Sequence, residues 1–143
     1  MYLPFKSGFS VSAPPVESVK KARVLIMDDE KMVRDIAGRM LSHLGHDFVG
    51  TEDGHQAIDA YQQAINKGSH FDLVLMDLTI PGGMGGKEAV TEIRKIDPDA
   101  KVIVSSGYAN DPVMANYQEY GFSGVIAKPF MMDELNRIIA KLL

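Results

Sequence analysis

Short apolar runs that alternate with longer amphipathic stretches are the feature that most restricts how this chain can fold. Each run is rich in β-branched or aliphatic residues and ends in a polar, glycine-containing or proline-containing turn. The runs cover residues 22–27, 46–50, 71–76, 101–105 and 123–127. Because alternating strands and helices are typical of an α/β fold with a parallel sheet, we predict a domain of βα units.

The stretches between and after these runs have the spacing of helices. Their apolar residues lie three and four positions apart, which forms one buried face. Asp97-Pro98 closes the third predicted helix, and Asp111-Pro112 opens the fourth. The apolar positions are Val33, Ile36, Ala37, Met40, Leu41 and Leu44 in the first helix, Ala57, Tyr61, Ala64 and Ile65 in the second, Ala89, Val90, Ile93 and Ile96 in the third, and Leu135, Ile138, Ile139 and Leu142 in the last.

The hydrophobicity of the runs predicts the order of the strands. The runs that begin at Val24, Leu73 and Val102 are continuously apolar, as strands covered by helices on both faces are. The run around Phe48 is weaker, which predicts an edge strand. With right-handed crossovers, these features favour a doubly wound parallel sheet of five strands in the order 2-1-3-4-5. Such sheets bind ligands at the carboxyl ends of the strands, here between the first and the third.

Composition and charge restrict the class of protein. The 143 residues include no cysteine, which excludes disulfides and thiol chemistry. The net charge of −4 gives no electrostatic reason to bind nucleic acid or an anionic membrane, and no apolar run is long enough to span a bilayer. The first residues have no signal-peptide core. We therefore expect a cytoplasmic protein whose partners are neither nucleic acids nor membranes.

The beginning of the chain differs from the rest. Residues 1–21 contain Pro4, Pro14 and Pro15 and show neither the strand nor the helix period. We predict a linker or tail over residues 1–21, followed by one domain over residues 22–143.

Charged and hydroxyl residues follow four of the predicted strands. Asp28 and Asp29 follow the first strand, Asp77 the third, Ser105 the fourth and Lys128 the fifth. These side chains should converge, because the carboxyl ends of parallel strands meet at one edge of the sheet. Carboxylates without histidine or cysteine suit a hard cation such as Mg²⁺. With a fixed ammonium and a hydroxyl donor, the set suits phosphoryl transfer to a nucleophilic oxygen.

Each of these residues also has a structural interpretation when it is taken alone. Asp28 and Asp29 could cap a helix, and Asp77 could be a turn residue. Lys128 could be a solvated lysine, and Ser105 a loop hydroxyl. Only their combination at successive strand ends indicates a functional site.

The combined markers resemble the receiver domain of two-component response regulators, over residues 22–143. The resemblance implies a flavodoxin-like fold and a phosphoryl group that passes from a histidine kinase to Asp77. The motifs that carry it are Asp28-Asp29, Asp77 in Met-Asp-Leu-Thr-Ile-Pro, Ser105, and Lys128-Pro129-Phe130.

The resemblance also implies a role for each marker. Asp29, Asp77 and the backbone carbonyl of Thr79 would hold Mg²⁺, and Asp28 would act mainly through water. Lys128 would pair with the phosphate, and a reorienting Ser105 would contact it, with Pro129 in a supporting position. An isolated receiver would not be an enzyme beyond its own phosphorylation and dephosphorylation.

Two alternative functions share part of this pattern. An aspartyl-phosphate phosphatase of the haloacid dehalogenase type also uses a strand-end aspartate and Mg²⁺. That class separates its two acids by one residue, whereas Asp28 and Asp29 are adjacent. A degenerate receiver would serve only as a protein-binding platform, but the complete acidic set and Lys128 are present here.

Three segments resemble one subgroup of receivers, those at the end of hybrid sensor histidine kinases. They are the glycine-rich residues 80–87, Ser-Ser-Gly-Tyr at 105–108, and Tyr2-Leu3-Pro4, which resembles the last strand of a kinase ATP-binding domain. This resemblance implies that the sequence is a fragment of a hybrid kinase. The partner would be a histidine kinase domain, in the same parent chain or in a separate one, or a histidine phosphotransfer protein.

One position departs from the receiver pattern. The family usually carries an aromatic residue three positions before the lysine, and it moves inward on activation; here that residue is Val125. A valine has few rotamers and no ring to relocate. We expect activation to act mainly on residues 105–111 and the following helix, with Tyr108 as the nearest aromatic candidate.

Overall fold

One parallel sheet organises the molecule. The computed structural model describes residues 21–108 and 110–143. The strands are β1 (Arg23–Met27), β2 (Asp47–Thr51), β3 (Leu73–Asp77), β4 (Val102–Ser106) and β5 (Gly124–Ala127). They pair in parallel in the order β2-β1-β3-β4-β5. The predicted fold class and strand order are confirmed.

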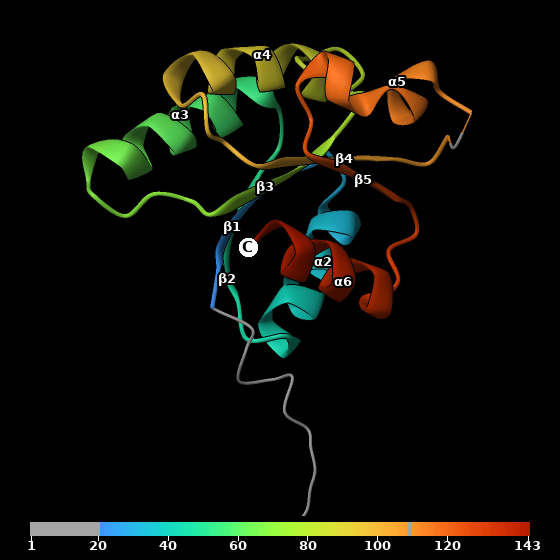
Figure 1. Cartoon of the computed structure of the whole chain (residues 1–143), viewed down its shortest axis with the longest axis horizontal. Helices are drawn as coiled ribbons and strands as arrows, with labels where there is room; N and C mark the ends of the chain where they lie inside the picture. The colour runs from blue at the N-terminus through green and yellow to red at the C-terminus, as the bar shows by residue number, and fades with distance from the viewer. Residues whose placement is uncertain (1–20, 109) are drawn as a thin grey trace, which may run out of the picture.

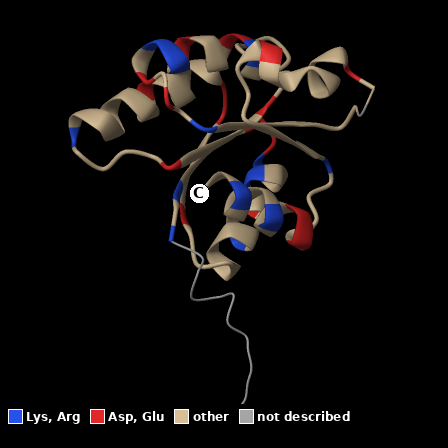
Figure 2. Ribbon diagram, in the orientation of Figure 1, with Lys and Arg blue, Asp and Glu red and all other residues tan. Residues whose placement is uncertain are grey.

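Helices cover both faces of this sheet, which gives three layers. α2 and α6 lie on one side, and α3, α4 and α5 lie on the other (Figure 1). The bounds are α2 (Lys31–His43), α3 (Gly54–Asn66), α4 (Gly86–Ile96), α5 (Pro112–Ala115), a 3₁₀ helix η1 (Tyr117–Tyr120) and α6 (Met132–Leu142). Charged residues are spread over helices and loops on both sides (Figure 2). No helix of the described residues is long and apolar enough to cross a membrane.

The alternation of side chains along each strand divides the core in two. Val74 and Val104 pack with one cluster, which includes Ile93 of α4. Their sequence neighbours Leu75 and Ile103 pack with the other cluster, which includes Ile139 of α6. The central strands are therefore buried on both faces, as their continuous hydrophobicity predicts. Four of the five residues of β2 are exposed, which confirms the expected edge strand.

The structure refines the predicted bounds. Each strand begins one or two residues later than its apolar run, because residues such as Ala22 and Phe71 are buried ahead of the strand ladder. The fourth helix begins at Pro112 as predicted, with the Asp111 side chain accepting a hydrogen bond from the Val113 N–H at 2.9 Å. It ends after one turn at Asn116, whose backbone leaves the helical region, and η1 follows. The predicted linker of residues 1–21 lies outside the described residues, except for Lys21.

Candidate functional site

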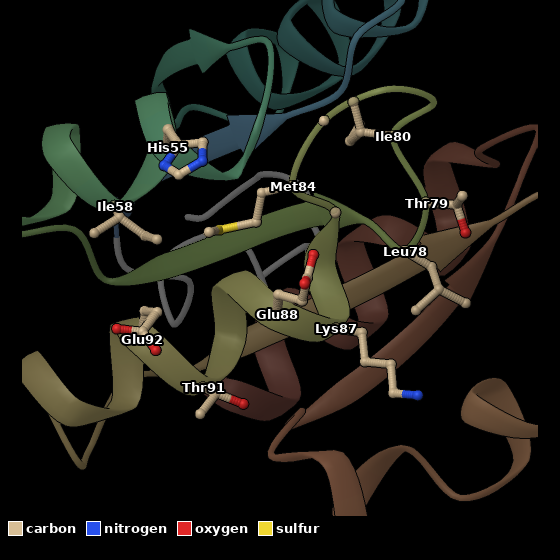
Figure 3. A pocket seen from close by; sticks show the side chains of 12 residues that line it. His55, Ile58, Leu78, Thr79, Ile80, Met84, Lys87, Glu88, Thr91 and Glu92 are labelled. Carbon is tan, nitrogen blue, oxygen red and sulfur yellow. The ribbon is translucent and has the colours of Figure 1, made fainter.

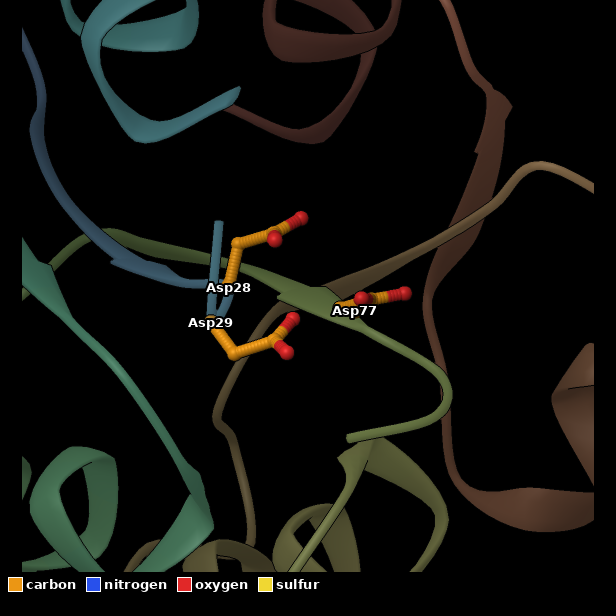
Figure 4. A group of neighbouring side chains, drawn as sticks. All are labelled: Asp28, Asp29 and Asp77. Atoms are coloured by element: carbon orange, nitrogen blue, oxygen red, sulfur yellow. The ribbon is translucent and has the colours of Figure 1, made fainter. Parts of the chain in front are cut away.

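Three carboxylates meet at the carboxyl ends of β1 and β3. Asp28 and Asp29 directly follow β1, and Asp77 is the last residue of the neighbouring β3. One oxygen from each lies within 4.8 Å of the other two. The three side chains leave the strand ends in the same general direction (Figure 4). Asp28 and Asp77 are buried, at 2% and 8% exposed, and Asp29 is exposed.

Lys128 completes this group from the end of β5. Its ammonium lies 2.6 Å from an oxygen of Asp28 and 3.2 Å from an oxygen of Asp77. The lysine backbone N–H donates to the Ser106 carbonyl at 3.0 Å, which anchors Lys128 beside the end of β4. Residues 100 positions apart in the sequence are thereby joined in one ion pair. The predicted convergence of these four residues is what the structure shows.

Burial and charge act in opposite directions on this site. Burial raises the pKa of Asp77, the charge of Asp28 raises it further, and Lys128 opposes both without cancelling them. Burial lowers the pKa of Lys128, but the hydrogen bond to Asp28 and the charge of Asp77 outweigh burial, so this pKa is raised. The charged form of Asp77 is thus disfavoured, whereas the charged form of the neighbouring Lys128 is favoured. A bound cation would stabilise the charged form of Asp77.

The donor set fits a hard divalent cation. Three carboxylates on two adjacent strands offer oxygen ligands only, and the exposure of Asp29 leaves one side open to water. Mg²⁺ retains several waters and binds through one or two carboxylates together with substrate phosphates. The residues that are present therefore suit a Mg²⁺ ion that shares its coordination with a phosphoryl group.

The connection between β3 and α4 carries Thr79 past the site. The Gly86 N–H donates to the Leu78 carbonyl at 3.0 Å and closes the connection. A Cβ atom on Gly85 would lie 2.5 Å from the Leu78 carbonyl oxygen, and one on Gly86 would lie 2.7 Å from that of Asp77. These glycines let α4 begin directly against the strand end that carries Asp77. The role of the Thr79 carbonyl as a metal ligand stays a prediction.

The two serines at the end of β4 are both buried and have different partners. Ser105 is 1% exposed, and its hydroxyl donates to the Met76 carbonyl at 3.4 Å. The Ser106 hydroxyl accepts a hydrogen bond from the Tyr108 N–H at 3.0 Å. Ser106 is also the residue whose carbonyl holds the Lys128 backbone. The family resemblance implies that the Ser105 hydroxyl reorients toward the phosphate, and these contacts make Ser106 a second candidate for that role.

The three predicted supporting residues, Tyr108, Val125 and Pro129, differ in exposure. Tyr108 is 79% exposed, and Val125 is half-buried against the core cluster beneath α4. Pro129 is exposed and follows a cis peptide bond. Among the described residues, none of these three forms a hydrogen bond or an ion pair with the carboxylates of the site. Their predicted roles in switching therefore stay predictions.

A cavity of about 970 Å³ opens beside the same connection, between α3 and α4. Figure 3 shows His55 and Ile58 on the α3 side, and Glu88 and Thr91 on the α4 side. Thr79 lines it, but the three aspartates do not. This cavity is thus a neighbour of the acidic site rather than the site itself.

A family model described as the response regulator receiver domain matches residues 24–140. The chain belongs to this family. It is a phosphoacceptor receiver domain of two-component phosphorelay signalling, and receiver domains partner with histidine kinases or phosphotransfer proteins. No finding supports the phosphatase or the degenerate-platform alternative.

Similar proteins include free-standing receivers and much larger signalling proteins. The chemotaxis protein CheY of Thermotoga maritima is 32% identical over 121 residues, which cover 81% of this chain and 96% of CheY. The sensor histidine kinase AruS of Pseudomonas aeruginosa is 29% identical over 139 residues. This chain spans only 13% of AruS, and 17% of the transcription factor Skn7 of Chaetomium thermophilum.

Solved receiver structures have the same fold. The receiver domain of a sensor histidine kinase from Pseudomonas aeruginosa, with a magnesium ion in its active-site cleft, matches with a TM-score of 0.74 and 26% identity. The match covers 86% of this chain and 98% of that receiver. The response regulator TrrA of Thermotoga maritima, in complex with Mg²⁺ and beryllofluoride, matches with a TM-score of 0.72 and 30% identity, over 85% of this chain and 99% of TrrA.

Sequence reasoning missed one residue of this receiver site, Arg34. Its guanidinium Nη1 donates to the Asp28 carbonyl at 2.7 Å. An arginine on the polar face of a predicted helix gives no sequence signal for such a contact. The contact depends on how closely α2 packs behind the end of β1.

Proposed function

We propose that Asp77 accepts the phosphoryl group of a phosphohistidine in a Mg²⁺-dependent reaction. The observation that carries the proposal is the position of Asp77: it ends the central strand β3, within 4.8 Å of Asp28 and Asp29 and 3.2 Å from the Lys128 ammonium. In the transfer, an Asp77 oxygen forms a bond to phosphorus as the phosphorus–nitrogen bond of the phosphohistidine breaks. The imidazole leaves as the second product.

The residues of the site have separate tasks in this reaction. Mg²⁺, when bound, would neutralise the carboxylates and the phosphoryl oxygens. Asp29, Asp77 and the Thr79 carbonyl would be its protein ligands, with Asp28 acting mainly through water. Lys128 already lies within ion-pair distance of Asp77 and would pair with a phosphoryl oxygen there. Hydrolysis of the acyl phosphate by water resets the domain.

Labelling with a small phosphodonor tests the acceptor residue. Incubation with acetyl phosphate and Mg²⁺ should add one phosphoryl mass to the intact protein, and Asp77→Asn should remove that addition, because an amide oxygen does not form the acyl phosphate. Asp35→Asn, at an exposed aspartate of α2, is the matched control and should be labelled like the wild type. Equal labelling of Asp77→Asn would rule out Asp77 as the acceptor.

The metal has its own test. Mg²⁺ should bind weakly to the unphosphorylated domain, because the site offers few direct protein ligands. Asp29→Ala should weaken binding most, since Asp29 is the exposed carboxylate that faces the open side of the site. Titration followed by backbone amide shifts measures the dissociation constant. A dissociation constant for Asp29→Ala that matches the wild type would place the metal elsewhere.

We further propose that the domain is the C-terminal receiver of a hybrid sensor histidine kinase. The similarity to AruS and to a receiver taken from another sensor kinase supports this origin. Residues 1–21 would then link a kinase core to the receiver over residues 22–143, and the donor would be that kinase or a histidine phosphotransfer protein. The full reading frame tests the proposal: a kinase core should be encoded upstream. A frame without one would exclude the hybrid origin.

A further inference from the structure

Arg34 of α2 holds the backbone of the acidic pair. Its side chain is 18% exposed, and its Nη1 donates to the Asp28 carbonyl at 2.7 Å. Its Nη2 lies 4.0 Å from an oxygen of Glu52, just past the end of β2. The stem of the side chain lies over Gly50, where a Cβ atom would be 3.5 Å from the Arg34 Cδ. The arginine thus joins α2, the end of β1 and the end of β2.

The carbonyl that Arg34 binds controls the direction of the next residue. The Asp28 carbonyl belongs to the planar peptide that ends at the Asp29 Cα, so the orientation of this plane decides where the Asp29 carboxylate lies. The other polar groups of Asp28 already have partners. Its N–H donates to the Thr51 carbonyl at 3.0 Å, and its Oδ1 accepts from the Glu30 N–H at 3.0 Å. Arg34 provides the remaining fixed contact of this peptide.

The start of α2 makes this contact more important. Glu30, the residue before the helix, makes no capping hydrogen bond with its side chain. The turn from β1 into α2 is therefore held by backbone contacts, by the Asp28 carboxylate and by Arg34. With its planar guanidinium, Arg34 donates to the Asp28 carbonyl through one nitrogen while the other lies at ion-pair distance from Glu52, whereas a lysine ammonium is a single compact charge.

We propose that Arg34 is a positioning residue for metal binding. It fixes the peptide plane between Asp28 and Asp29, so that the Asp29 carboxylate stays within reach of the ion that Asp77 binds. Arg34 itself touches neither the metal nor the phosphoryl group. The inference rests on the proposed function, because it assumes that the three carboxylates hold Mg²⁺.

Mg²⁺ titration of Arg34 variants tests this role. Arg34→Gln should weaken Mg²⁺ binding about tenfold, the usual loss when a residue that orients a ligand is removed. Arg34→Lys should recover part of the affinity, since one donor to the carbonyl remains. Arg39→Gln, at an exposed arginine of the same helix, is the control and should bind like the wild type. Saturating Mg²⁺ should restore the labelling rate of Arg34→Gln with acetyl phosphate.

A second readout needs no metal. In the metal-free domain, hydrogen exchange of the Asp28 and Glu30 amides should be faster in Arg34→Gln than in Arg39→Gln, while amides in α6 exchange alike. Unchanged Mg²⁺ affinity, or equal exchange at Asp28 and Glu30, would overturn the proposal. If Arg34→Gln does not fold, Arg34→Lys decides by the same measurements. A wild type that binds no Mg²⁺ would instead refute the proposed function, and the exchange experiment would still judge the contact of Arg34.

Discussion

Asp77 is the residue at which the requirements of folding and of phosphoryl transfer conflict. Folding buries its carboxylate beside a second carboxylate, Asp28, and both effects raise its pKa. Lys128 compensates in part through its ion pair at 3.2 Å. Phosphoryl transfer requires a nucleophilic carboxylate, but the buried charge of this carboxylate destabilises the fold while no metal is bound.

Replacement of this carboxylate should therefore stabilise the metal-free domain. At pH 7, Asp77→Asn should raise the free energy of unfolding by about 1 kcal/mol, the usual size of a single-substitution effect. The amide keeps the shape of the side chain and removes the repulsion with Asp28. Urea unfolding of the two proteins without Mg²⁺ measures the difference. The control is Asp35→Asn, at an exposed position, which should change the stability little.

The pH dependence of this gain has a definite sign. Because the native pKa of Asp77 is raised above the ordinary aspartate value of 3.8, the native state binds more protons than the unfolded state between these two values. The stability that Asp77 contributes is present below 3.8 and is lost as the pH rises through the native pKa. The advantage of Asp77→Asn should therefore shrink as the pH is lowered toward 4. An advantage that grew on acidification would contradict this account.

The element that differs most from its sequence expectation is the fourth helix. α5 is a single turn, Pro112–Ala115, and η1 continues it after Asn116. The preceding loop carries Tyr108, which is 79% exposed, close to the serines at the end of β4. On the neighbouring strand, Val125 packs half-buried and has no ring that could swing. A helix of a single turn has few hydrogen bonds of its own, so we expect this element to reorder most easily.

Activation should accordingly be strongest in this element. Binding of beryllofluoride, a phosphate mimic, should change backbone amide shifts most at residues 105–114 and less around Val125 and in α6. The same comparison on Ser105→Ala and Ser106→Ala identifies the switch hydroxyl, because the variant that lacks it should lose most of the response. If the largest changes in amide shifts lay around Val125 and residues 105–114 were unaffected, this prediction would be wrong.

At the scale of the whole molecule, the described residues already supply two core clusters, one on each face of the sheet. Helices that follow Lys21 in the sequence cover both faces of the sheet, and among the described residues the buried clusters begin at Ala22. The family match likewise begins at residue 24.

Removal of the first residues should cost little stability, because they show no apolar periodicity and contain two adjacent prolines. A chain that begins at Lys20 should keep its melting temperature within a few degrees of the full chain, measured by circular dichroism. A large drop would mean that residues 1–19 pack on the domain, as a contact with an upstream kinase segment would require. A chain that begins at Val24, which also loses the buried Ala22, is the comparison and should melt earlier.

The local pattern of the chain was enough to determine its architecture. Alternating apolar runs and helical stripes defined the βα units, and the polar β2 run identified the edge of the sheet. The same pattern placed Asp28, Asp29, Asp77 and Lys128 at strand ends, and parallel strands necessarily bring such ends together. These conclusions follow from the sequence because each strand or helix shows its buried face through a pattern that extends over many residues.

Only the tertiary structure decided the contacts that depend on single distances. It joined Lys128 to Asp28 at 2.6 Å, turned the Ser105 hydroxyl toward Met76, and placed Arg34 on the Asp28 carbonyl. It also ended α5 after one turn. Such features depend on how closely one element packs against another, to within the length of a hydrogen bond, and a sequence period has no information at that resolution. A pattern specifies which face of a helix is buried, whereas packing specifies which atom that face touches.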